Sequence, residues 1–389
     1  MSWVGVKSSK DNAMGSGTDN TESTVDSNLQ DIHLESDVEH QAVSIGEVGA
    51  PTRFRHIKNN KYTRRLYLVL GALAAIFVFS ALMRLSIKKS KRSGSVSIPS
   101  ANGSDDIDLS GVSIREGHLM ILVHDIAVDK SERDAVIASN SPQRQAIRWL
   151  ADEDPMNIEI PETRFDTSYP AFIQRYSSAV LAFSFGSELL KPLGFLSGEK
   201  ECNWNADFKR PDGSILTQGL ICEPGDDQIM KIVLQTIGLQ NDIPLELGNL
   251  HSIKHIHLDE NNLVGKLPPT MRRLSLLREF TATRNALSGH LPQFLANMPS
   301  LRHIELSKNN FAGHLSSAFV HADTDEETDD VAASPLRVLA LDNNKFSGPL
   351  DSLSSLTTLE ELYLNDNAFT GHVGSTFTEL SELAIFDAR

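Results

Sequence analysis

The stretch that decides the fold is residues 253–268, which read IKHIHLDENNLVGKLP. The same pattern returns at residues 277–292 as LREFTATRNALSGHLP and at residues 301–315 as LRHIELSKNNFAGHL. Two further copies, at residues 336–350 and 359–373, follow a break in the spacing. The shared motif L-x-L-x-x-N-x-[L/F]-x-G predicts stacked repeats, because unrelated hydrophobic patterns do not also keep Asn and Gly in register.

Each recurring position of the motif has a physical reason. The alternating apolar pair puts two side chains on one face of a short strand. The Asn amide carries both a donor and an acceptor, so we expect it to bond backbone groups where the strand bends, and the Gly suits a turn in which a Cβ would clash. One repeat cannot close a core, so the pattern predicts a solenoid. The expected structural ladder consists of Asn261, Asn285, Asn309, Asn344 and Asn367.

These repeats resemble the plant-type leucine-rich repeat, and the resemblance covers residues 228–389. It implies an α/β fold, a right-handed solenoid with a parallel β-sheet on its concave face and short 3-10 or turn segments on its convex face. Members of this family usually bind peptides, glycans or proteins on the concave face. The chain stops inside a further coil, so we expect the repeats to be incomplete at the C-terminus or to pair end-on with a partner.

Composition and motifs exclude several classes of protein. The formal net charge of −15 argues against nucleic-acid binding, which needs a basic face. Two cysteines are too few for a cysteine-rich scaffold or a four-cysteine zinc site. No kinase motif, nucleophile elbow or zinc-protease motif is present, so we predict no catalytic residues, no cofactor and no enzyme activity.

The N-terminal part is predicted to be a tail and a membrane anchor. Residues 1–65 read as a disordered acidic tail that ends in a basic juxtamembrane segment. Residues 66–83 (LYLVLGALAAIFVFSALM) carry no charge, and we predict a single transmembrane helix, a signal-anchor, over residues 66–87. Six basic residues precede the span and five follow it, so charge does not decide its orientation.

Between the span and the repeats we predict a linker and a cap. Residues 88–139 form the linker or membrane-proximal region, which carries a glycosylation sequon at Asn102 and a segment, 117–128, that suits either a strand or a helix. Residues 140–227 form a helical, Cys-containing N-terminal cap. Its first helix starts with Ser141 as the capping residue and Pro142 at the first position, and a second spans residues 170–185. The resemblance implies that such a helical pair covers the first coil.

The two cysteines bear on the compartment. Cys202-Asn203-Trp204 followed by Cys222 is similar to the C-x-W…C element of plant-type caps, which implies a disulfide between Cys202 and Cys222. Two free thiols are the alternative. A disulfide requires an oxidising compartment, so the repeats would then face the exterior and the N-terminus the cytoplasm, with the plasma membrane favoured over an endomembrane.

The candidate ligand-binding residues lie on or just after the predicted strands. A zinc ion held by His255, His257, Glu279, His303 and Glu305 is disfavoured, because no metal-ligand spacing is present, and solvated histidines are the preferred interpretation. The acidic run 323–330 is interpreted as a solvated loop and not as a calcium site. The expected concave-face set is His255, His257, Asp259, Glu279, Thr281, Arg284, His303, Glu305, Lys308, Asp342, Glu361, Tyr363 and Asn365.

The resulting functional hypothesis is a single-pass membrane protein whose ectodomain binds a peptide, protein or glycan in a receptor-like way. A signal would pass through a co-receptor or a cytoplasmic adaptor, because the predicted cytoplasmic part is too short for a kinase domain. A structural or adhesive surface protein and an inhibitor of a secreted hydrolase are the alternatives. A further alternative places the repeats in the cytosol with reduced cysteines.

Overall fold

The computed structural model describes residues 97–98, 107–108, 111–127, 130–319, 334–371 and 375–388. The predicted tail 1–65, the predicted span 66–87, Asn102 and the acidic run 323–330 lie outside the described residues. Within the described ranges, no helix has both the length and the apolar character that crossing a bilayer requires.

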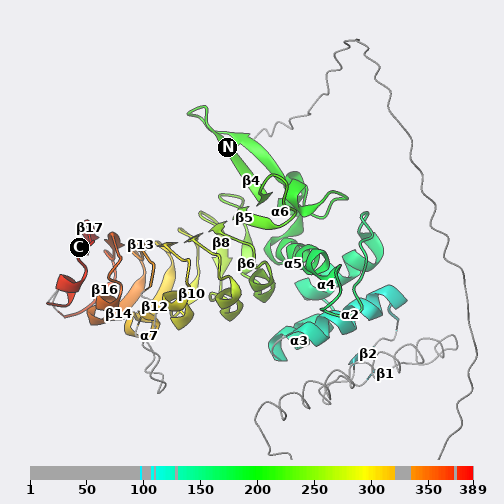
Figure 1. Ribbon diagram of the computed structural model, residues 1–389, viewed down its shortest axis with the longest axis horizontal. Helices are drawn as coiled ribbons and strands as arrows, with labels where there is room; N and C mark the ends of the chain where they lie inside the picture. Colours follow the sequence, from blue (N-terminus) through cyan, green and yellow to red (C-terminus); the bar gives the residue numbers. More distant parts are fainter. Residues whose placement is uncertain are drawn as a thin grey trace, which may run out of the picture. The chain divides into compact units, whose positions relative to one another are not determined.

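A nine-stranded sheet is the main element of the described chain (Figure 1). Its strands from β5 to β17 are all parallel, whereas β3, β4 and β5 pair antiparallel. The parallel repeat sheet predicted from the sequence is therefore confirmed. In sheet order the strands are β17 (Ile385–Asp387), β15 (Glu361–Tyr363), β13 (Val338–Ala340), β11 (His303–Glu305), β9 (Glu279–Thr281), β7 (His255–His257), β5 (Ile229–Val233), β4 (Ile215–Cys222) and β3 (Asn205–Lys209).

Each coil continues from its sheet strand into a second short strand and then a 3-10 helix. In Figure 1 the short helices run along the side of the coils opposite to the nine-stranded sheet. The second strands are β6 (Gln240–Asp242), β8 (Asn262–Val264), β10 (Ser288–Gly289), β12 (Asn310–His314), β14 (Lys345–Gly348) and β16 (Ala368–Phe369). The short helices are η4 (Leu245–Asn249), η5 (Pro269–Arg273), η6 (Gln293–Asn297), η7 (Asp351–Ser355) and η8 (Ser375–Glu379), with the α-helical turn α7 (Ser316–Phe319) in the third coil.

The core is a continuous apolar spine inside the coils. The central residue of each sheet strand from β7 to β15 points inward and is fully buried: Ile256, Phe280, Ile304, Leu339 and Leu362. Burial of one such side chain contributes about 1.5–3 kcal/mol, so the stacked column is a main source of stability. In β17, by contrast, Ile385 and Phe386 are exposed.

The ladder asparagines join each coil to the one before it. The Oδ1 atom of Asn285 accepts a hydrogen bond from the backbone N–H of Leu263 at 3.0 Å. Its Nδ2 atom donates to the carbonyl oxygens of Leu258 at 3.0 Å and Ala282 at 3.1 Å. Asn309, Asn344 and Asn367 repeat this pattern. Turn groups that would otherwise be buried without partners are satisfied in this way.

A left-handed residue precedes every ladder asparagine. A positive φ is uncommon for residues other than Gly, so its recurrence marks a tight bend that every coil shares. Two residues that the sequence proposed for ligand binding, Arg284 and Lys308, occupy this position and therefore also form the turn. The five residues and their φ angles are Glu260 (56°), Arg284 (55°), Lys308 (57°), Asn343 (56°) and Asp366 (55°).

The chain before the repeats is mainly helical. Segment 117–128, which the sequence left open, lies mostly in the helix α2, and the predicted cap is present, since the Oγ atom of Ser141 accepts a hydrogen bond from the backbone N–H of Arg144 at 3.0 Å. The elements are β1 (Ser97–Ile98), β2 (Ile107–Asp108), α2 (Ile114–Ile126), α3 (Lys130–Ile137), α4 (Pro142–Arg148), the π-helical turn η1 (Trp149–Glu153), α5 (Tyr169–Phe185), α6 (Ser187–Leu190), η2 (Lys191–Leu193) and η3 (Glu201–Asn203).

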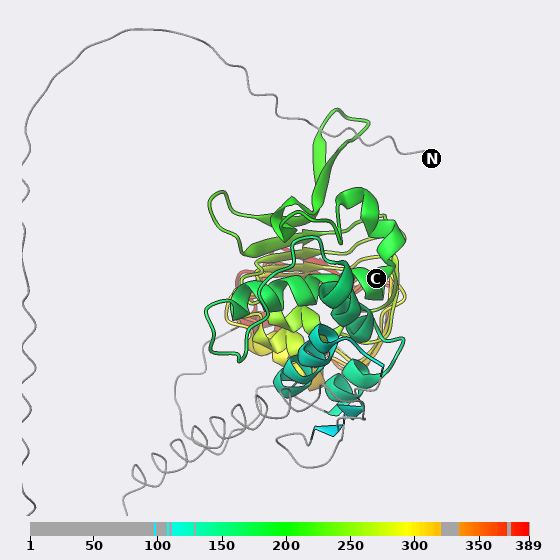
Figure 2. The ribbon, with the colours of Figure 1, turned by 90° about the vertical axis from the view of Figure 1, so that its right-hand side faces the viewer.

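These helices pack together and against the first coil (Figure 2). The Nδ2 atom of Asn241 in β6 donates to the carbonyl oxygen of Ser184 in α5 at 2.9 Å. The Nε2 atom of Gln143 in α4 donates to the carboxylate of Glu246 in η4 at 3.0 Å. Residues 114–126 and 130–137, which the sequence assigned to the linker or membrane-proximal region, form α2 and α3 within this helical packing.

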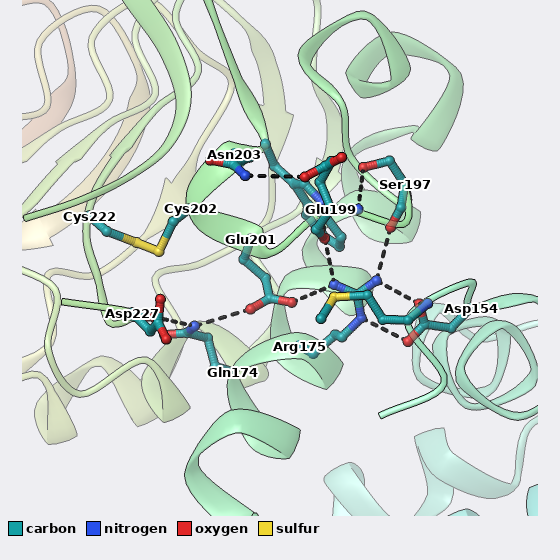
Figure 3. Close-up of polar contacts among 12 residues, drawn as sticks. Asp154, Gln174, Arg175, Ser197, Glu199, Glu201, Cys202, Asn203, Cys222 and Asp227 are labelled. Carbon is teal, nitrogen blue, oxygen red and sulfur yellow. Dashed lines mark hydrogen bonds and ion pairs between the residues drawn. A yellow bond between two sulfur atoms is a disulfide. The ribbon is translucent and has the colours of Figure 1, made fainter. Parts of the chain in front are cut away.

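A buried arginine connects the helices to the Cys-containing hairpin (Figure 3). The Arg175 side chain is 1% exposed and forms ion pairs of 2.6 Å with both Asp154 and Glu201. Its guanidinium carbon lies 5.0 Å from the ring centre of Trp149 and 5.1 Å from that of Trp204. Burial lowers the pKa of Arg175, but hydrogen bonds to the two carboxylates outweigh this effect and raise its pKa above the ordinary value.

The disulfide between Cys202 and Cys222 is confirmed, with a Cα–Cα distance of 5.4 Å (Figure 3). It joins η3 to the end of β4, the strand that continues the sheet from β5. Such a cross-link over a loop of this length contributes about 3 kcal/mol in the chain-entropy model. It therefore closes the β3–β4 hairpin at its base, next to the first repeat strand β5.

Candidate ligand-binding sheet face

The outward surface of the sheet strands is the candidate site, called the sheet face below. Each strand from β5 to β17 contributes two residues to this face, in register with those of its parallel neighbours about 4.8 Å away. Among them Val233, Thr281 and Ala340 are buried. The first row is Lys231, His255, Glu279, His303, Val338, Glu361 and Ile385, and the second row is Val233, His257, Thr281, Glu305, Ala340, Tyr363 and Asp387. Eight of the thirteen predicted ligand-binding residues belong to these rows.

The N-terminal half of the sheet face holds a histidine–glutamate cluster. The Nδ1 atom of His255 lies 3.0 Å from the Oε2 atom of Glu279, and the Nε2 atom of His257 lies 3.6 Å from the same oxygen. The two imidazole rings stack with centres 6.3 Å apart. Burial lowers the pKa of His257, an effect that nearby Glu279 partly opposes.

A hydrogen-bond chain leads away from this cluster toward the bend. The Nδ1 atom of His257 lies 3.1 Å from the hydroxyl of Thr281, which donates to Asp259 at 2.5 Å. Asp259 also accepts from the side chain of Gln235 at 2.6 Å and from the backbone N–H of Thr283 at 2.7 Å. Asp259 is therefore engaged in holding the bend and the neighbouring imidazole.

The C-terminal half of the sheet face is acidic. His303 pairs with Glu305 across 2.7 Å, and this hydrogen bond raises the pKa of His303 above its usual value. The hydroxyl of Tyr363 donates to Glu361 at 2.9 Å, which raises the pKa of Tyr363. Between these two polar pairs the strand β13 presents only Val338 and Ala340. The sheet face is therefore apolar at β13 and polar on the strands on either side of it.

The other predicted residues lie beyond the strand ends, in the bends. Arg284 pairs with Glu260 across 3.0 Å, and Lys308 is exposed. Asp342 accepts hydrogen bonds from Ser307 and Asn343, and Asn365 bonds to the carboxylate of Asp366 at 3.2 Å. Asp342 is thus held by contacts in its own bend and to the preceding coil, and Asn365 by a contact in its own bend. Arg284 and Lys308 are the exposed cations of these bends.

A cleft that the sequence did not indicate lies between α5 and the first coil. Its volume is about 160 Å³, and its walls include Tyr169, Ile173, Gln174, Asn249 and His251. Sites for small molecules usually enclose about 300–1,000 Å³, so this cleft is too small for a typical organic ligand. The open sheet face remains the better candidate for binding a larger partner.

No family model matches the chain, and neither does any curated protein. Solved structures of plant receptors match part of it. The plant peptide hormone receptor RGFR1, in complex with RGF2, is 27% identical over 41% of this chain and 24% of the receptor, with a TM-score of 0.36. A TDR receptor is 28% identical over 38% of this chain and 24% of its own, with a TM-score of 0.33.

A third solved structure is the Arabidopsis receptor kinase HAESA in complex with the peptide hormone IDA and the co-receptor SERK1. It is 23% identical over 56% of this chain and 33% of its own length, with a TM-score of 0.45. The chain therefore spans about a quarter to a third of the length of these receptor structures.

Proposed function

We propose that this chain, whose repeats are plant-type leucine-rich repeats, binds a peptide or protein partner on its sheet face and acts by binding alone. The observation that carries the proposal is the pair of aligned rows, in which a polar side chain stays partly exposed on each strand from β5 to β17 except β13. An extended peptide that crosses these strands would meet a new pair of side chains about every 4.8 Å.

The chemistry of the C-terminal half suggests what the partner offers there. Val338 and Ala340 favour an apolar side chain of the partner, because neither of their side chains can bond a polar one. Glu305 and Glu361 lie on the strands that flank these two residues and favour a positively charged neighbour. The formal net charge of −15 also attracts a positively charged partner over longer distances. We therefore propose a peptide segment with an apolar residue next to a basic one.

A random-peptide display library selected on the purified full chain tests this proposal. Selected peptides are expected to share an apolar residue beside Lys or Arg and to lose at least tenfold in affinity for the Tyr363→Ala variant. The matched control is Lys345→Ala, which removes an exposed side chain from β14, outside the sheet face. Equal binding to both variants, or selected peptides without the shared pair, would overturn the proposal.

We also propose that residues 66–87 anchor the chain in the plasma membrane with the N-terminus in the cytoplasm. The disulfide supports this orientation, because bonds of this kind persist in oxidising compartments. Binding would then be passed on through a co-receptor or a cytoplasmic adaptor. In intact cells, added protease is expected to destroy an epitope tag placed after Arg389 and to spare one placed before Met1. Protection of the C-terminal tag would place the repeats in the cytosol instead.

A further inference from the structure

The histidine–glutamate cluster at the N-terminal half of the sheet face has the dimensions of a metal site. One ligand atom from each of His255, His257 and Glu279 lies within 4.8 Å of the other two. Donors bound to the same tetrahedral zinc ion, each about 2.0–2.1 Å from it, lie roughly 3.3 Å apart. The oxygen–nitrogen distances of 3.0 Å and 3.6 Å bracket that value.

The surrounding hydrogen bonds leave one imidazole nitrogen ready to bind a metal. The hydroxyl of Thr281 donates its proton to Asp259, so it accepts from the Nδ1–H group of His257. The Nε2 atom of His257 then carries a free lone pair. That atom is buried and has no hydrogen-bond partner among the described residues, although it faces Glu279. Second-shell contacts of this type orient the histidine ligands of metal sites.

We propose that His255, His257 and Glu279 bind one zinc ion, with water completing a four-coordinate site. Two imidazoles and one carboxylate are a ligand set that zinc uses, whereas calcium and magnesium require oxygen ligands. Thr281 and Asp259 act as positioning residues that fix the His257 tautomer.

The charges around the cluster permit a divalent cation. Lys231 stands beside His255 in the first row and opposes cation binding, whereas Glu279 and Asp259 each contribute a negative charge. Side chains of all three ligands are partly exposed, at 33% for His255, 12% for His257 and 29% for Glu279, so an ion can reach them from solvent. The inference requires no partner and stands independently of the proposed peptide binding.

The sequence alone disfavoured a zinc site because its five candidate ligands come from three strands with no metal-ligand spacing. His255 and His257 stand two residues apart on β7, and Glu279 faces His255 from β9 in the aligned sheet. The separation of 24 residues is one repeat, which is not a metal-ligand spacing in any local motif. His303 and Glu305, which the sequence grouped with them, pair with each other one strand further along.

Zinc titration of the purified, chelator-treated full chain by calorimetry tests the proposal. One tight site is expected, with affinity lowered at least tenfold in His255→Gln and Glu279→Gln. The positioning variant Asp259→Asn is expected to weaken binding by about 10–100-fold while leaving the stoichiometry unchanged. Cobalt(II) added in place of zinc is expected to give the visible absorption of a four-coordinate ion, and this absorption should disappear in His255→Gln.

The matched control is His303→Gln, which removes a partly exposed histidine from the same row and should bind zinc as the unaltered chain does. His255 is partly exposed, so its replacement is compatible with folding, and circular dichroism of each variant verifies this. The proposal is overturned if the unaltered chain has no tight site, or if His255→Gln binds zinc as tightly as His303→Gln does.

Discussion

The Oδ1 atom of Asn309 accepts a hydrogen bond from the backbone N–H of Leu287 at 3.0 Å, although 22 residues separate the two in sequence. The same amide donates to the carbonyl oxygens of Ala282 and Leu306. One side chain thus completes a turn in its own coil and in the previous one. It is also buried, which makes these bonds costly to lose.

Replacement of this asparagine by aspartate should be severe. In Asn309→Asp an acceptor oxygen replaces the donating NH₂ group and faces two carbonyl oxygens. We expect a loss of about 3 kcal/mol in the free energy of unfolding, typical of an uncompensated buried charge. Denaturant unfolding followed by circular dichroism measures it. The neighbouring exposed Asn310→Asp is the control, and an equal loss in both variants would contradict the structural role assigned to Asn309.

Replacing each of two glycines by alanine distinguishes the energetic cost of backbone strain from that of steric clash. Gly213 and Gly219 both have positive φ angles, 87° and 124°. A Cβ atom on Gly213 would meet nothing within 4 Å, whereas one on Gly219 would lie 2.1 Å from the carbonyl oxygen of Trp204. We expect Gly213→Ala to cost about 1–2 kcal/mol from strain alone and Gly219→Ala to cost clearly more. Thermal melting of both variants tests this order, and a smaller loss for Gly219→Ala would refute it.

Replacement of the buried Arg175, even by lysine, should lower the free energy of unfolding. Arg175→Met leaves Asp154 and Glu201 as buried carboxylates without their counter-ion, so we expect a loss of about 3–5 kcal/mol in the free energy of unfolding. Arg175→Lys should recover only part of it, because lysine cannot bond both oxygens of Asp154 in the bidentate way that Arg175 does. The exposed Arg302→Met serves as control in the same unfolding assay. Comparable losses in the two Met variants would count against this account.

The pKa values of His257 and His303 should lie on opposite sides of the usual value of 6.5. The pKa of His303 is raised by its hydrogen bond to Glu305, so its contribution to stability is complete below pH 6.5 and is lost as the pH rises through the folded pKa. The pKa of His257 is lowered by burial, so it instead reduces stability as the pH falls below 6.5.

NMR titration of the metal-free chain measures both values. In Glu305→Gln the pKa of His303 is expected to fall, whereas in Glu260→Gln, which changes an exposed carboxylate in a bend, it should stay where it is. A His303 pKa that does not respond to Glu305→Gln would show that another group sets it.

The repeating part of the molecule was predictable, and the connections around it were not. Positions such as Ile256 and Phe280 recur with a fixed period, so their burial follows from the pattern. The left-handed bend was missed because its residues, for example Glu260, Arg284 and Lys308, differ in type from coil to coil. Arg175 was missed because its carboxylate partners lie 21 and 26 residues away in segments without any repeat.

In the candidate site, the positions of single residues were predictable from the sequence, but the contacts between them were not. Alternation along each strand identified the outward residues, since it depends only on local geometry. Which of them touch depends also on how the side chains turn: Glu279 stands in register between His255 and His303. Its carboxylate contacts His255, whereas His303 pairs with Glu305.

Because every ladder asparagine reaches back to the preceding coil, synthesis on the ribosome imposes a delay on folding. A coil that has emerged keeps an unfinished turn until the next asparagine has been translated. For Leu263 and Leu287 that wait is 22 residues, but for Phe311 it is 33, because the insertion must be translated first. The third coil is therefore the one that a nascent chain leaves incomplete for longest, and the point at which chaperone binding or a translational pause would have most effect.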